Sequence, residues 1–547
     1  MKISTRLSQL TLLILTILQS GHSAPISPQS ELIPVIVQAQ SLEQALEAVL
    51  ELDGEVTHEL GLIDAVAARF PSQNLAVLES RQSIRRVYED RTLMAAGFFS
   101  FNQWSPPTPS TSYPERVEAW QLHGQGLTGR GVTLAVVDTG LFVKDEVVLD
   151  SENRYRILAH YDAIEDRDRS IYLPSDGNGH GAHVSGVSLN SRRGTDSDQL
   201  NGIAPDADLV VVRAFDAQGQ GTYADVIRAL DWVVGARSTY GIQVLNLSFS
   251  ASPRSYYWDD PLNQAVMRAW EAGIVVVTSA GNQGPDPMTV GVPGNIPYVI
   301  TVGAMTDNFT SSNPNDDRLA SFSAAGPTLE GFVKPEIVAP GGHILSVMSP
   351  FSNLGMTDPD GSFFDVYREV SGTSQATAVV SGLVALLLQE HPQWTPDEVK
   401  CRLLTSAKPA RNADGDLAYS VFQQGAGLVD GLEALQSNEA GCANLGLDIH
   451  KDLAGIEHYQ GPARWDEDDG VFYLEGEGYF WDGTFLATNG NPWVDPPWQS
   501  PPFVTGNPWV DPPSVTGNPW VDPPSLNSSW SGDLSETMNI NTWVAPE

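Results

Sequence analysis

The stretch GVTLAVVDTG, residues 131–140, is a short apolar run, rich in β-branched residues, that ends in an aspartate and a glycine. Four later stretches share this character: DLVVVRAFD at 208–216, IQVLNLSFS at 242–250, GIVVVTSAGN at 273–282 and YVITVGAM at 298–305. Strands buried on both faces have this composition, and such burial is typical of a parallel sheet covered by helices. Helical patterns at 224–238 and 261–273 lie between these runs. The sequence therefore predicts an α/β fold over 113–440, with a doubly wound, mostly parallel sheet flanked by helices.

The composition of the chain limits its partners. It has 547 residues, 41% of them hydrophobic, and a formal net charge of -37. Nucleic acids and anionic membrane surfaces would repel so acidic a chain, so we expect no nucleic acid and no membrane as partner. We expect a monomer, and carboxylates in such number could also hold Ca²⁺.

The first 96 residues predict a leader and a small domain. Residues 1–23 combine Lys2 and Arg6 with a short apolar core and small residues at its end, which indicates a secretory signal peptide and an extracellular location. A buried N-terminal helix is the alternative. Residues 24–96 alternate strand and helix patterns, including a helix that Ser41 would cap, so we predict an α+β unit. A Pro- and Ser-rich linker follows at 97–112.

The C-terminal region, 441–547, differs from the rest of the chain. It has no Lys or Arg after Arg464, and NPWVDPP occurs at 491–497, 507–513 and 518–524. Proline on both sides of Trp-Val favours an extended chain. Its tryptophans could stack on polysaccharide or cell-envelope sugars or dock into a groove, or the region could be a solvated tail without a partner. The two cysteines, Cys401 and Cys442, could form a disulfide or remain buried thiols.

Four polar residues lie where chemistry is expected in such a sheet. Asp138 ends the first strand, His180 begins a predicted helix in NGHGAHVSG (178–186), Asn282 follows a strand, and Ser374 lies between a glycine turn and an apolar helix in 370–388. A serine nucleophile needs an imidazole base, and that base needs a carboxylate to hold its tautomer. A side-chain amide and the first N–H groups of a helix suit a developing oxyanion. The four together predict nucleophilic catalysis by serine.

These segments resemble the subtilisin-like serine proteases, the subtilase family, in which the order Asp, His, Ser is known. The matching motifs are VVDTG (136–140), GHGAHVSG (179–186), SAGNQG (279–284) and SGTSQA (371–376), supported by 201–221, ASFSAAGP (320–327) and VKPEIVAPGG (333–342). The resemblance implies that Asp138 orients His180, that His180 is the general base, and that Ser374 attacks the scissile peptide bond. Asn282 and the Ser374 N–H would bind the oxyanion.

The resemblance also implies a substrate site and a zymogen. The stretch 245–250 would pair with the substrate backbone, and the side-chain pocket would be bordered by Leu247, Ser248, Phe249, Ser250, Ser279, Ala280 and Gly281. Residues 24–96 resemble the family's inhibitory propeptide, a ferredoxin-like α+β domain, with VYED (87–90) near its end and cleavage expected near Ala96. Catalysis of this kind requires no cofactor. Structural Ca²⁺ is usual in the family, but no loop here is specific enough to assign ligands.

The second histidine of the motif, His183, is implied to be a packing residue, and we assign no metal to the pair because no H-E-x-x-H motif accompanies it. Three positions depart from the family's pattern. Ala182 replaces the usual threonine. Gln375 replaces a methionine next to the nucleophile, which predicts slow inactivation by peroxide. Ser250 replaces a glycine beside the cleft, which changes the expected substrate preference.

Two other functions compete with a secreted, autoprocessed endopeptidase. A catalytically idle scaffold that binds through its tryptophan-rich tail has no reason to keep Asp138, His180, Asn282 and Ser374 together. A processing protease of the kexin type calls for a sizeable β-rich domain after the catalytic one, and the proline-interrupted tail does not resemble such a domain.

Overall fold

The computed structural model describes residues 32–95, 98–99, 108–308, 310, 313–357, 366–476 and 478–485. The predicted signal peptide, 1–23, and the NPWVDPP repeats lie outside the described residues.

A nine-stranded sheet forms the centre of the molecule. Its order is β16-β15-β14-β12-β7-β10-β8-β9, and β17 also pairs with β15. Only β16 and β9, both at its margins, run antiparallel to their neighbours. The strands are β7 (Thr133–Asp138), β8 (Ile157–Asp162), β9 (Arg167–Asp168), β10 (Asp208–Arg213), β12 (Ile242–Leu247), β14 (Val275–Ser279), β15 (Ile300–Thr306), β16 (Arg318–Leu319) and β17 (Ile337–Gly342). From β7 the chain passes to β8 and β9 at one margin, returns to β10 beside β7, and then continues on the other side through β12, β14 and β15, which confirms the predicted doubly wound α/β fold.

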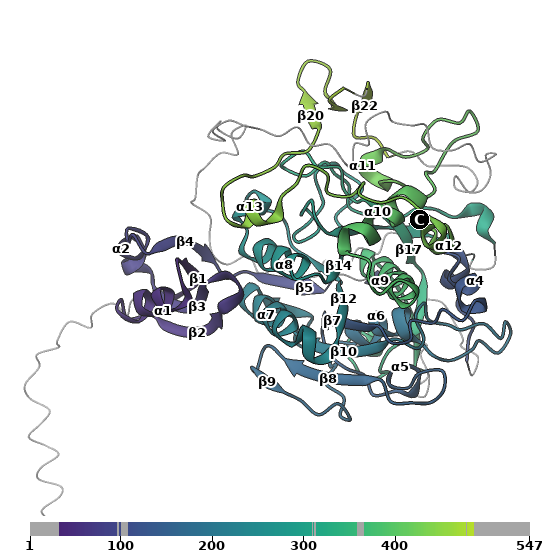
Figure 1. The fold of residues 1–547 in the computed structure, drawn as a ribbon, viewed down its shortest axis with the longest axis horizontal. Helices are drawn as coiled ribbons and strands as arrows, with labels where there is room; N and C mark the ends of the chain where they lie inside the picture. The colour runs from purple at the N-terminus through teal and green to yellow at the C-terminus, as the bar shows by residue number, and fades with distance from the viewer. Residues whose placement is uncertain are drawn as a thin grey trace, which may run out of the picture.

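Helices cover both faces of this sheet. In Figure 1, α7 (Tyr223–Tyr240) and α8 (Pro261–Glu271) lie on one side, and α6 (His180–Leu189) and α9 (Thr373–Glu390) lie on the other. The first sixteen residues of α9 are all buried, so this helix runs through the core rather than over the surface. The helix therefore holds its N-terminal residues rigidly against the sheet.

Shorter elements complete the catalytic region. The helices are α3 (Tyr113–Arg116), α4 (Ala119–Gly124), α5 (Asp145–Val148), α10 (Pro396–Ser406), α11 (Val421–Gln424), α12 (Gly431–Gln436) and α13 (Ile449–Leu453), and the strands are β11 (Gln220–Thr222), β13 (Phe249–Ser250), β18 (Ile344–Val347) and β19 (Tyr367–Ser371). Among the described residues, no helix is both long and apolar enough to cross a membrane.

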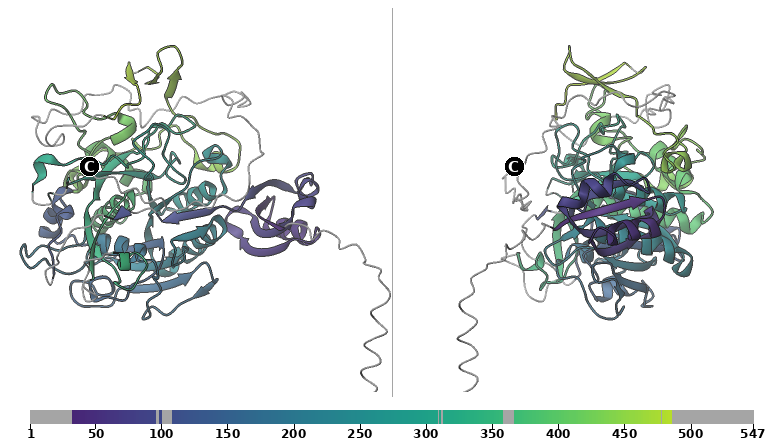
Figure 2. Two further views of the ribbon diagram at one scale, coloured as in Figure 1. Left: turned by 180° about the vertical axis from the view of Figure 1, so that it is seen from behind. Right: turned by 90° about the vertical axis from the view of Figure 1, so that its left-hand side faces the viewer.

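Residues 32–89 form a separate unit that protrudes from the body (Figure 2). It contains β1 (Leu32–Ala39), α1 (Leu42–Leu50), β2 (Glu55–Leu60), β3 (Ala65–Pro71), α2 (Leu75–Glu79) and β4 (Ile84–Glu89), with the ferredoxin-like sheet order β2-β3-β1-β4. Ser41 caps α1 by accepting a hydrogen bond from Gln44 N at 3.3 Å. The sequence did not predict β2, because the strand EVTHEL is mostly polar and only its last residue is buried.

Two short strands lead from this unit into the body. β5 (Thr92–Ala95) lies between β11 and β13 and is antiparallel to both. β6 (Phe98–Phe99) pairs with β19, where Phe98 is opposite Ser371. Figure 1 shows β5 entering the body from the N-terminal unit.

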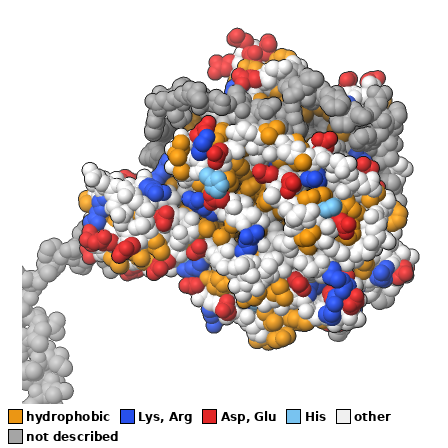
Figure 3. All heavy atoms as spheres, viewed as in Figure 1, with side chains coloured by type: hydrophobic (Ala, Val, Ile, Leu, Met, Phe, Trp, Pro, Cys, Tyr) orange, Lys and Arg blue, Asp and Glu red, His pale blue; other side chains and the backbone are white. Residues whose placement is uncertain are grey.

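The C-terminal extension, residues 441–485, packs against the catalytic region. A disulfide joins Cys401 in α10 to Cys442, which answers the question that the sequence left open. Beyond it lies a three-stranded antiparallel sheet of β20 (Ala463–Asp466), β21 (Val471–Leu474) and β22 (Tyr479–Trp481). Acidic side chains gather at its tip, where the turn reads DEDD at 466–469 (Figure 3). The described part of the region is thus an ordered extension of the catalytic domain.

Candidate active site

Asp138 is the last residue of β7, the strand from which the sheet winds in both directions. Its carboxylate is buried, and its Oδ1 accepts hydrogen bonds from Thr139 N at 2.7 Å and from His180 Nδ1 at 2.8 Å. Oδ2 lies 3.0 Å from the same ring nitrogen. A buried carboxylate is costly without partners, and these contacts supply them. They also fix His180 with its Nδ1 protonated, so Nε2 is the basic nitrogen.

His180 is the first residue of α6, where a buried carboxylate organises the preceding turn. Asp176 accepts hydrogen bonds from Gly179 N at 2.6 Å, Ala182 N at 2.7 Å and Thr139 Oγ1 at 2.8 Å. Burial raises the pKa of Asp176, and the nearby Asp138 adds to that increase. The sequence analysis missed this residue, because Gly179 is the N-cap of α6 and Asp176 lies three positions before it, outside the usual capping position. Asp176 connects the loop of the histidine to the loop of Asp138.

The second histidine of the motif makes only internal contacts among the described residues. His183 is fully buried, and its Nε2 donates to the Arg368 carbonyl at 3.0 Å. Its Nδ1 faces Gln375 Nε2 at 3.4 Å. Burial lowers the pKa of His183 to about 3, so the ring is neutral at physiological pH. These contacts are those of a packing side chain.

Ser374 is the second residue of α9, a helix that begins directly after the glycine turn at Gly372. Its Oγ donates to the Ser248 carbonyl at 3.0 Å, while Ser248 Oγ donates to the Ser374 carbonyl at 2.9 Å. Because His180 and Ser374 begin two helices that pack together, the fold brings the predicted base and the predicted nucleophile to the same edge of the sheet.

Asn282 is held by one end of its amide. Its Oδ1 accepts from both Thr373 N and Thr373 Oγ1, each at 2.9 Å. Its Nδ2 is buried and has no hydrogen-bond partner in the described structure. A buried donor without a partner is unfavourable unless a ligand completes it. Thr373, which the sequence analysis did not single out, therefore aims this donor beside the Ser374 N–H.

The predicted substrate residues line up along two neighbouring segments. Ser279 Oγ donates to the Phe249 carbonyl at 2.9 Å, which ties the segment 247–250 to the segment 279–281. The Phe249 ring is buried against Phe215, with the ring centres 5.1 Å apart. Phe249 therefore borders a substrate through its backbone, because its ring faces the core. Leu247 and Ala280 are also buried.

Gln375, next to the nucleophile, is fully buried beside His183. A thioether nevertheless lies close to the catalytic loop: a Cβ built on Gly179 would lie 2.9 Å from Met348 Sδ. Met348 is fully buried, so slow inactivation by peroxide stays our prediction. In the described residues, no group of three or more His, Cys, Asp or Glu side chains is arranged to hold a metal ion.

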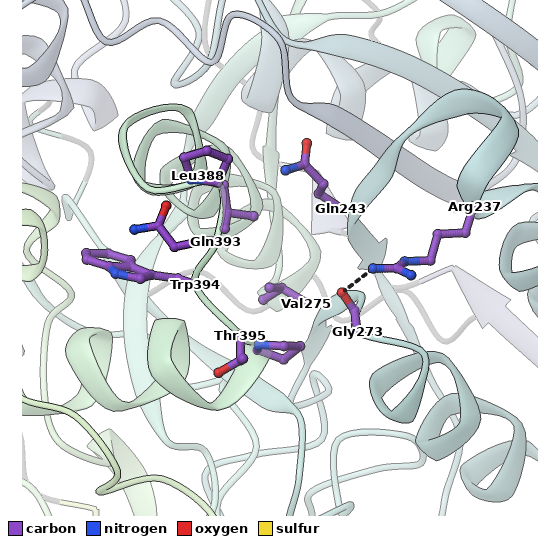
Figure 4. A pocket seen from close by; sticks show the side chains of 10 residues that line it. Arg237, Gln243, Gly273, Val275, Leu388, Gln393, Trp394 and Thr395 are labelled. Carbon is purple, nitrogen blue, oxygen red and sulfur yellow. Dashed lines mark hydrogen bonds between the residues drawn. The ribbon is translucent and has the colours of Figure 1, made fainter.

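A pocket of about 230 Å³ lies elsewhere in the molecule (Figure 4). Its lining includes Gln243 and Val275, near the amino ends of β12 and β14, together with Trp394 and Thr395. Asp138 and Asn282, by contrast, lie at or beyond the carboxyl ends of strands. The pocket is therefore at the opposite edge of the sheet and is not part of the candidate active site.

Comparison with known proteins gives the same family for sequence and fold. The model of the subtilase family matches residues 129–427. Serine protease AprX of Bacillus subtilis is 38% identical over 335 residues, which are 60% of this chain and 71% of AprX. Subtilisin E of the same organism is 30% identical over 410 residues, 73% of this chain and 88% of that protein.

Among solved structures, fervidolysin from Fervidobacterium pennivorans, a keratinolytic enzyme related to subtilisin, has the same fold with a TM-score of 0.57 and 22% identity. The likeness covers 75% of this chain and 62% of fervidolysin. With the family model, the two relatives and the shared sheet in agreement, the chain belongs to the subtilase family and is a serine endopeptidase.

Proposed function

We propose that this protein is a secreted endopeptidase that cuts peptide bonds with Asp138, His180 and Ser374, and that it is made as a zymogen which removes its own residues 24–96. The observation that carries the proposal is the partnerless Asn282 Nδ2 beside the helix start that bears Ser374.

The chemistry follows from the positions of these groups. Ser374 Oγ attacks the scissile carbonyl while His180 Nε2 takes its proton, and Asp138 stabilises the imidazolium that forms. Asn282 Nδ2 and the Ser374 N–H stabilise the oxyanion. His180 then gives the proton to the leaving amine, which departs and leaves an acyl-enzyme. Water attacks this ester with His180 again as the base, and Ser374 is restored.

Self-processing is supported by the strands on either side of the nucleophile. β5 pairs with β13, so that Met94 is opposite Ser250 and Ala95 is opposite Phe249. β6 pairs with β19 at Ser371, three residues before Ser374. The chain thus pairs on one side of the nucleophile up to Ala95 and on the other side at Phe98 and Phe99. We propose the Ala96–Gly97 peptide bond as the site of cleavage.

Inhibition before cleavage is supported by contacts between the N-terminal unit and the helices of the catalytic region. Arg91 Nη2 donates to Asp260 Oδ2 at 3.2 Å, and His58 Nε2 lies 3.2 Å from Asp225 Oδ1. Asp90 accepts a hydrogen bond from Ala224 N, in the first turn of α7, at 2.9 Å. These contacts would keep β5 in the cleft until the bond is cut and the unit dissociates.

The remaining parts of the proposal concern ions, partners and state of assembly. We propose that catalysis needs no cofactor, since the triad supplies every reacting group, and that any bound Ca²⁺ serves stability alone. A chelator should then lower the melting temperature more than the initial rate.

We propose a monomer whose NPWVDPP repeats contact polysaccharide or cell envelopes. Pull-down on insoluble polysaccharide with and without residues 486–547 tests that contact.

The decisive experiment compares the wild-type precursor with Ser374→Ala. The wild type should yield a mature chain that begins at Gly97, react with a fluorophosphonate at Ser374 and cleave peptides. Ser374→Ala should remain full length and unlabelled. Ser406→Ala, in α10 and away from the cleft, is the matched control and should process normally. Peptide cleavage by Ser374→Ala at the wild-type rate would exclude the triad, and a mature start well beyond Pro107 would exclude the proposed bond.

A further inference from the structure

We infer that Ser250 narrows the pocket for the side chain that precedes the scissile bond, so that the enzyme selects alanine or glycine there. The inference rests on the proposed function, because it assigns the substrate class of that same site.

The position of the pocket follows from the strand register. Ala95 in β5 is opposite Phe249, and a substrate strand continued by one residue comes opposite Ser248. The Ser248 carbonyl accepts the hydrogen bond of Ser374 Oγ at 3.0 Å, so that residue is the one next to the nucleophile. Side chains of an extended strand alternate between its two faces. The substrate side chain opposite Ser248 therefore lies on the same face as the side chain opposite Ser250, two residues earlier in the substrate. The pocket is therefore bounded by 248–250.

Two further segments close the pocket. Gly291 N donates to the Ala280 carbonyl at 2.9 Å, and Ala251 and Val292 exchange hydrogen bonds of 3.0 and 2.7 Å. The segments 249–251, 279–281 and 290–292 are thus hydrogen-bonded neighbours next to the position of that substrate residue. Ala280 and Val290 belong to a small buried apolar cluster with Ala324. The walls that these three segments form carry no charged side chain.

Ser250 occupies the space that the two glycines of these walls leave. A Cβ built on Gly281 would lie 3.1 Å from Ser250 Oγ, and one built on Gly291 would lie 2.9 Å from Ser250 Cβ. The serine side chain therefore lies between the two glycines and takes volume that a glycine at 250 would free. In a rigid pocket one methylene group changes specificity by roughly 10- to 200-fold. The chain has Ala96 and Gly97 at its own proposed cleavage site, which fits this restriction.

The test measures kcat/KM on peptides that differ only in the residue before the scissile bond: glycine, alanine, leucine or phenylalanine. The mature wild-type enzyme should cleave the alanine peptide at least tenfold better than the phenylalanine peptide. Ser250→Gly should raise the phenylalanine-to-alanine ratio about tenfold or more, and Ser250→Val should lower the alanine rate relative to glycine. Ser252→Gly, an exposed serine two residues away, is the matched control and should leave the ratios unchanged.

Self-processing supplies a second readout. Ala96→Phe should slow processing of the precursor, and Ser250→Gly in the same chain should restore it. Suppose that the enzyme reacts with fluorophosphonate and cleaves peptides, but its phenylalanine-to-alanine ratio of kcat/KM changes less than twofold in Ser250→Gly. This result overturns the inference about Ser250 and leaves the proposed function intact. Wild-type preference for phenylalanine does the same. A protein that neither reacts nor cleaves overturns the proposed function together with it.

Discussion

The N-terminal unit and the C-terminal extension are both additions to the catalytic region, but they are attached in opposite ways. The N-terminal unit has its own core, in which Val37, Val49 and Phe70 are fully buried between its sheet and its helices. The other face of that sheet lies on α7 and α8, and its centre is apolar: Leu60, Ile63 and Ala65 are buried in the same cluster as the core of the catalytic region. The rim of this contact is polar. A domain with its own core can leave without unfolding, although the apolar centre of this contact is then exposed to water.

The C-terminal extension has no such core. Its buried side chains Phe472, Leu474 and Trp481 form one cluster with Val333 and Phe422 of the catalytic region. The Cys401–Cys442 disulfide adds a covalent connection. Without a core of its own the extension would lose its fold on separation, and the disulfide keeps it attached, so it is a permanent part of the enzyme. The separate core of the N-terminal unit is consistent with its proposed release, and the shared core and disulfide of the C-terminal extension are consistent with its retention.

The largest expected effect is on the core that the C-terminal extension shares with the catalytic region, compared with the separate core of the N-terminal unit. Phe422→Ala should destabilise the mature enzyme by about 3–5 kcal/mol, because it leaves a cavity among Phe472, Tyr479 and Trp481. Phe70→Ala, a matched loss in the N-terminal unit, should leave the mature enzyme unchanged and weaken inhibition by the separate propeptide. Unfolding rates measured on mature enzyme that a fluorophosphonate has blocked at Ser374 avoid self-digestion. Equal unfolding rates for wild type and Phe422→Ala would contradict a shared core.

A smaller effect is expected from the buried carboxylate that fastens α13. Asp452 Oδ2 accepts from Tyr257 OH at 2.5 Å and Tyr298 OH at 3.0 Å, and Oδ1 lies 2.7 Å from His458 Nδ1. Asp452→Asn keeps the shape but replaces one acceptor by a donor, which should cost about 1–3 kcal/mol. Thermal unfolding of the mature enzyme measures the loss. Asp468→Asn, at the exposed hairpin tip, should change the melting temperature little.

The catalytic fold was predictable because two sequence features identify its strands. Each strand is an apolar run rich in β-branched residues, and a polar residue lies at or after the carboxyl end of several of them. Asp138 and Asn282 were found in this way. Thr373 and Asp176 were not, because each acts only through a partner: Asn282 for Thr373, and the 179–182 turn for Asp176. Hydrogen bonds between distant loops leave no periodic pattern in a sequence.

The sequence did not predict the three-stranded sheet of the C-terminal extension, for a different reason. Its apolar residues are few, and alternate members such as Phe480 are exposed, so it resembles a polar tail until Phe422 is placed beneath it. β2 was missed similarly, since it is a mostly polar strand. Elements that bury one side against a remote partner depend on tertiary contacts that local propensity does not encode.

Release of the N-terminal unit should depend on Arg91. Its guanidinium lies 4.5 Å from the centre of the Tyr223 ring and donates to the buried Asp260. Arg91→Ala in the separate propeptide should weaken inhibition roughly 10- to 100-fold, since hydrogen bonds to charged groups contribute about 1.5–3 kcal/mol. The inhibition constant against the mature enzyme measures this. Arg85→Ala, exposed on β4, is the control, and an equal loss there would contradict a specific role for Arg91.

The smallest expected effect is the pH dependence of this release. Burial raises the pKa of Asp90 to about 6, and Asp225 and Glu89 add to the increase while His58 opposes it. A carboxyl whose pKa is higher in the complex than in the free propeptide favours binding when it is protonated. Its contribution is complete below the free value near 4 and is lost as the pH rises through about 6.

Inhibition by the separate propeptide should therefore weaken by roughly tenfold between pH 5 and pH 7.5, the equivalent of about one pKa unit. The expected change is below the full shift, because at pH 5 the carboxyl of the free propeptide is already mostly ionised. Asp90→Asn has no proton to lose, so it should inhibit at pH 7.5 as well as at pH 5. If the wild-type propeptide inhibits more tightly at pH 7.5, the helix end stabilises the ionised form and release is driven by cleavage alone.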